Sequence, residues 1–145
     1  MKNVALMVLL LVGGFGVARA AGAETNLAGR IGVAAVFLLT AIGHFVKPDE
    51  MLHMIPPSLP ARRTAVILSG FLELFFAFGI VVARFAHATG VAICVFLVLV
   101  TPLNVYSALN KVQFGGHAAG PRYLAVRLPL QLLLLIWTWW FAVRT

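Results

Sequence analysis

Long apolar runs alternate with short polar segments along the whole chain. A helix needs about 20 residues to cross a hydrocarbon layer about 30 Å thick. Four runs reach this length or nearly so: Arg30–Val46, Thr64–Ala83, Ala88–Leu109 and Tyr123–Val143. Pro102 and Pro129 lie inside the last two runs, but a membrane bundle tolerates prolines where neighbouring helices satisfy the freed carbonyls. The pattern predicts an all-α integral membrane protein whose residues 30–145 form an antiparallel four-helix transmembrane bundle.

An extra hydrophobic segment, Val4–Ala18, precedes this bundle within residues 1–29. Lys2, the short apolar stretch and the sequence Ala18-Arg19-Ala20 are typical of a secretory signal with a small-residue cleavage site. The alternative is a short extra helix that the mature protein keeps. We expect the helix to be kept, and both interpretations stay open at this point.

The composition indicates a membrane protein rather than a soluble one. Hydrophobic residues make up 62% of the chain and charged residues only 10%, whereas soluble domains carry about 25% charged residues. The net charge of +7 comes from Lys and Arg scattered mostly at the ends of the apolar runs. That distribution suits contact with membrane lipids and argues against nucleic acid as a partner. The single cysteine, Cys94, allows neither an intrachain disulfide nor a two-thiol redox couple.

Two loops differ from the other connections. Lys47–Arg63 contains four prolines, and Asn110–Arg122 is rich in glycine. Both loops lie at the same end of an antiparallel bundle, which we call the loop side; the opposite end is the far side. Lys and Arg are slightly more frequent around these loops than at the far side. The positive-inside rule therefore places the loop side in the cytoplasm.

Five polar side chains interrupt the apolar runs, and each is a candidate functional residue because polar groups are costly inside a membrane. They are His44, Glu73, Asn104, Arg127 and Gln131. With a rise of about 1.5 Å per residue, Glu73 lies roughly 13 Å from the loop side and Arg127 roughly 6 Å from it. All five therefore fall in the loop-side half of the membrane.

This common depth predicts a polar pocket that opens between the two loops. We expect Glu73 and Arg127 to pair, directly or through one water or Gln131, because each is expensive alone. Apolar side chains should fill the far half: Leu134, Ile136 and Phe96. The alternative is a structural polar network without a void. No metal-ligand spacing and no haem, dinucleotide or serine-nucleophile motif is present.

Short motifs in the four runs and the proline-rich loop together resemble one family. They are Gly43-His44-Phe45 with Pro48, Met54-Ile55-Pro56-Pro57, Leu59-Pro60, Ser69-Gly70 with Glu73, Pro102 with Asn104 and Tyr106, and Arg127-Leu128-Pro129-Leu130-Gln131. Over about residues 30–143 the chain resembles the DoxX-like membrane proteins. Val4–Ala18 falls outside that four-helix pattern.

The resemblance implies that the chain binds a lipophilic small molecule as a membrane subunit of a redox system. The family is named for membrane subunits of a thiosulfate:quinone oxidoreductase, so a quinone is the implied ligand and a bacterial inner membrane the implied location. The candidate ligand-binding residues are His44, Glu73, Asn104, Tyr106, Arg127 and Gln131. Arg127 and Gln131 would donate hydrogen bonds to a carbonyl oxygen, while His44 or Glu73 would exchange protons. Electrons would come from a partner protein or a soluble donor.

A second hypothesis, from a different functional class, carries equal weight. The chain could be a non-enzymatic accessory or assembly subunit of a membrane protein complex, in which the polar cluster only holds the helices together. A small transporter and a lipid isomerase are weaker alternatives. Fold alone does not decide among these functions.

Overall fold

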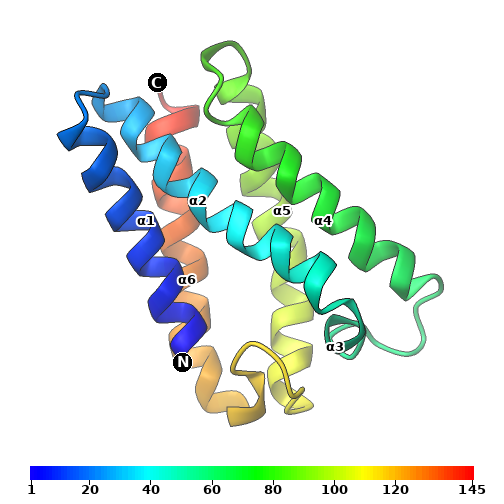
Figure 1. Cartoon of the computed structure of the whole chain (residues 1–145). Helices are drawn as coiled ribbons and strands as arrows, with labels where there is room; N and C mark the ends of the chain where they lie inside the picture. Colours follow the sequence, from blue (N-terminus) through cyan, green and yellow to red (C-terminus); the bar gives the residue numbers. More distant parts are fainter.

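Each apolar run of the sequence forms a helix in the computed structural model, which describes residues 1–145. Figure 1 shows the long helices side by side. The elements are α1 (Lys2–Ala20), α2 (Thr25–Val46), α3 (Pro48–Leu52), α4 (Arg62–Gly79), α5 (Ala83–Leu109), the 3-10 helix η1 (His117–Ala119), α6 (Pro121–Thr138) and its π-helical continuation η2 (Trp139–Val143). The boundary expected at residue 30 lies inside α2.

The protein is an all-helical membrane protein. Four helices are long and apolar enough to cross a bilayer: α1, α2, α5, and α6 together with η2. The run predicted at Thr64–Ala83 forms the shorter α4, which is not among these four and carries Arg62, Arg63 and Glu73 within its 18 residues. Phe71, Phe75 and Phe78 on α4 are nonetheless exposed, as residues facing lipid would be.

Successive long helices run in opposite directions, as the apolar runs predicted. In Figure 1 the N-terminus, α3 and the segment around η1 lie at the lower end, which is the loop side, and the C-terminus lies at the opposite end. A Cβ atom at Gly116 would come within 3.1 Å of the Met1 backbone nitrogen, so the start of α1 reaches the glycine-rich loop. The first helix therefore belongs to the same bundle as the other four.

Helix α1 packs closely against α2 because both carry glycine where they meet. A Cβ atom at Gly14 would lie 3.1 Å from the Cα atom of Gly32, and one at Gly32 would overlap the carbonyl oxygen of Leu11. Leu11 is completely buried. Glycine allows such backbone contact between membrane helices, so α1 forms part of the core.

A second close approach joins α2 to α4 and brings two polar positions together. A Cβ atom at Gly70 would lie only 2.7 Å from the Cβ atom of His44. The absent side chain at Gly70 lets the two helices approach, one turn before Glu73 on α4. Gly70 on α4 thus allows His44 and Glu73, two candidate site residues, to lie close together.

Candidate functional site

A cavity of about 540 Å³ lies among the helices in the loop-side half. Its volume is within the range of about 300–1,000 Å³ typical of small-molecule sites. Of the 29 residues that line it, 16 are hydrophobic, so most of its wall suits an apolar ligand. Met51, Met54 and Ile55 from the proline-rich loop and Gln113 and Phe114 from the glycine-rich loop line it. The cavity therefore reaches both loops, as expected.

Four of the six candidate residues line this cavity: His44, Glu73, Asn104 and Arg127. Tyr106 and Gln131 do not. Of the apolar residues expected in the far half, Phe96 and Leu134 line the cavity, but 53% of Ile136 is exposed. The expectation for Ile136 was wrong because depth along a helix does not reveal which face turns inward.

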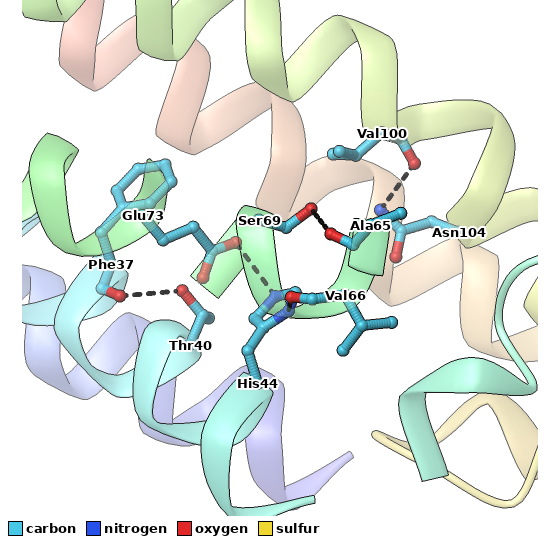
Figure 2. Close-up of polar contacts among 9 residues, drawn as sticks. All are labelled: Phe37, Thr40, His44, Ala65, Val66, Ser69, Glu73, Val100 and Asn104. Carbon is cyan, nitrogen blue, oxygen red and sulfur yellow. Dashed lines mark hydrogen bonds and ion pairs between the residues drawn. The ribbon is translucent and has the colours of Figure 1, made fainter. Parts of the chain in front are cut away.

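Partly buried His44 and buried Glu73 form a pair between α2 and α4, and Figure 2 shows the two side chains pointing toward each other. His44 Nε2 lies 3.5 Å from Glu73 Oε1. His44 Nδ1 lies 2.7 Å from the carbonyl oxygen of Val66, which can only accept, so Nδ1 carries a hydrogen. One proton between Nε2 and Oε1 can then reside on either group, which makes the pair suited to proton exchange.

Gln131 joins α6 to α5 instead of pointing into the cavity. Its Nε2 donates to Thr101 Oγ1 at 2.9 Å and to the carbonyl oxygen of Leu97. Its Oε1 accepts a hydrogen bond from Asn104 Nδ2 at 3.2 Å. Gln131 therefore holds Asn104 at the cavity wall through the side-chain amide.

Arg127 does not pair with Glu73, contrary to the direct or Gln131-bridged pairing expected from depth. The structure has ion pairs at Glu73, Glu50 and Asp49, and none of them involves Arg127. Its side chain donates from Nη1 to the sulfur of Met7 on α1, at 3.4 Å, and it lies close to the Tyr123 hydroxyl. Depth placed both charges in one half of the membrane, but helix rotation turned Glu73 toward α2 instead.

Residues that sequence reasoning missed come from α1, the glycine-rich loop and the start of α6. Asn3, Leu6 and Met7 of α1 line the cavity, as do His117 and Tyr123. Tyr123 precedes Arg127 by four residues and so shares its helix face, which was a usable signal. His117 stands alone in the sequence and gave no signal.

His117 is buried, and its imidazole ring is uncharged. Its Nδ1 lies 2.8 Å from the carbonyl oxygen of Phe114, and its ring contacts that of Tyr123 with centroids 4.8 Å apart. Burial lowers the pKa of His117 below its ordinary value; the bond to Phe114 opposes this shift and the nearby Arg127 charge adds to it. The ring therefore presents an unprotonated Nε2 to its surroundings at neutral pH.

Three buried polar atoms of cavity-lining residues have no hydrogen-bond partner. They are Glu73 Oε2, His117 Nε2 and Arg127 Nε. An unsatisfied buried polar group costs about 1–3 kcal/mol. The residues of this largely apolar wall thus include three unpartnered polar atoms. No group of three or more His, Cys, Asp or Glu side chains is arranged to hold a metal ion.

Comparison with known proteins identifies a family. A family model described as a domain of unknown function (DUF8561) matches residues 33–142. The chain belongs to this family. The DUF8561 match runs from within α2 to the end of α6 and most of η2, so it covers the paired helices of the site and leaves α1 outside. No curated protein and no solved structure matches the chain.

Proposed function

We propose that the protein binds a lipophilic small molecule in the loop-side cavity, as a membrane subunit of a redox system in a bacterial inner membrane. The observation that carries this proposal is the combination of a largely apolar wall with three unpartnered buried polar atoms. A structural network would instead satisfy its own polar groups, because buried polar groups are normally hydrogen-bonded.

A quinone is the candidate ligand, and the DoxX-like resemblance of the sequence suggested it. Arg127 would donate to a carbonyl oxygen of the quinone head. The His44–Glu73 pair would supply or accept protons, since reduction of a quinone consumes both electrons and protons. The apolar wall would take the ring and the start of the tail. Electrons would come from a partner protein or a soluble donor.

The test is extraction of the purified protein into organic solvent, followed by quinone analysis. We expect the wild-type protein to carry a quinone and Arg127→Ala to lose most of it while keeping its helical content. Arg122→Ala is the matched control, because Arg122 is exposed and forms no hydrogen bond or ion pair. Equal retention by the wild-type protein and Arg127→Ala, or no ligand at all, would favour the accessory-subunit hypothesis.

A further inference from the structure

The two carboxylates around the cavity contact side chains other than Arg127. Lys47 Nζ lies 3.4 Å from Glu50 Oε2, and His44 Nε2 lies 3.5 Å from Glu73 Oε1. These two pairs account for both carboxylates in the cavity wall. The guanidinium of Arg127 has no acidic side chain within ion-pair distance.

The side chain of Arg127 does not extend to the loop-side surface of the bundle. Arg127 lies six residues after the start of α6, and Met7 lies five residues after the start of α1. Both helices start at the loop side, so the two residues lie at similar depth, roughly 8–9 Å by helical rise. Because Nη1 contacts Met7, the side chain extends across the bundle instead of rising toward headgroups.

The guanidinium of Arg127 lacks strong hydrogen-bond acceptors. Its Nε is buried without an acceptor, and a thioether sulfur is only a weak acceptor. A buried charge is costly unless an opposite charge and hydrogen bonds compensate for it. A neutral carbonyl would supply hydrogen bonds but leave the charge uncompensated.

We propose that Arg127 anchors an anionic head group, so that the preferred ligand is a single-chain amphiphile ending in an oxyanion. This inference rests on the proposed binding of a lipophilic molecule, and it names an anionic amphiphile in place of the neutral quinone as the preferred ligand. Tyr123, one turn before Arg127 in the same wall, offers a hydroxyl as a second donor. The chain of the ligand lies along the apolar side chains of Phe37, Phe96 and Leu97. A carboxylate and a phosphate monoester share the required chemistry.

The test compares three probes with the same twelve-carbon chain. Radiolabelled dodecanoate, dodecyl phosphate and dodecanol are titrated into the full chain in phosphatidylcholine nanodiscs, with empty nanodiscs subtracted. A charge-assisted hydrogen bond contributes about 1.5–3 kcal/mol, which corresponds to roughly 10- to 100-fold in affinity. We expect at least one of the two anionic probes to bind more tightly than dodecanol by about that factor. The tighter of the two identifies the head group as carboxylate or phosphate.

Substitutions at Arg127 test whether this residue causes the preference for an anionic probe. Arg127→Gln should bring the ratio between the preferred anion and dodecanol close to one, whereas Arg127→Lys and the exposed control Arg122→Gln should keep it. Arg127→Lys also covers the case in which Arg127→Gln fails to fold. A preference that survives in a folded Arg127→Gln protein would overturn the assignment.

The outcomes separate this inference from the proposed function. If dodecanol binds as tightly as both anions, the anionic head group is wrong while binding of a lipophilic molecule stands. If none of the three probes binds and a short-chain quinone does not bind either, both proposals fall.

Discussion

At the scale of single residues, Arg127 is held in a position that costs stability. Arg127→Gln removes a partly buried charge that has no acidic partner and keeps polar atoms, so we expect it to stabilise the ligand-free protein by about 1–3 kcal/mol. Thermal unfolding of delipidated protein in neutral detergent measures this change in stability. Arg122→Gln is the control, and its stability should differ little from that of the wild-type protein. A clear loss of stability would show that Arg127 has a stabilising role in the free protein. Sites that sacrifice stability for binding are common.

The His44–Glu73 pair makes a second prediction at this scale. Glu73→Gln should destabilise the bundle less than Glu73→Leu, because an amide can still form a hydrogen bond with His44 Nε2, 3.5 Å from the present carboxylate. The expected difference is about 1 kcal/mol in thermal unfolding. In a His44→Ala background the two substitutions should become nearly equal, since the partner is gone. A difference that persists there would mean that another group satisfies Glu73.

At the scale of elements, glycine decides how closely the helices pack. Gly32→Ala should separate α1 from α2 and cost about 1–3 kcal/mol, because its Cβ would overlap the Leu11 carbonyl. Gly16→Ala is the matched control: a Cβ there meets nothing within 4 Å, and alanine favours helix over glycine by about 1 kcal/mol. Thermal unfolding of both variants checks this. A stable Gly32→Ala protein would show that α1 does not depend on this contact.

The elements also show why part of the site could be predicted. Apolar run length predicted the helices, and rise per residue placed His44, Glu73, Asn104 and Arg127 in one half of the membrane, where they line one cavity. The direct Glu73–Arg127 contact expected from depth is absent because a helix can present a residue of given depth to any neighbour. The contact at Gly70 turns Glu73 toward His44, and no local pattern records that rotation.

At the scale of the whole molecule, the arrangement predicts the position of both termini. Six Lys or Arg residues lie at the loop side, namely Lys2, Lys47, Arg62, Arg63, Lys111 and Arg122, and four lie at the far side, namely Arg19, Arg30, Arg84 and Arg144. The positive-inside rule therefore predicts a cytoplasmic N-terminus and a C-terminus outside the cytoplasm. A fluorescent protein that folds only in the cytoplasm should be dark when fused after Thr145. A phosphatase that is active only outside should be active there, and the reverse pattern would invert the topology.

The sequence by itself determined that this is a helical membrane protein and how deep each polar residue lies. Both follow from local quantities: the length of an apolar run and the rise of a helix. Only the tertiary structure decided that α1 forms part of the cavity wall, that Gln131 bonds to α5, and that Arg127 lacks an acidic partner. These features depend on the rotation and spacing of helices, which close packing among all the helices sets together.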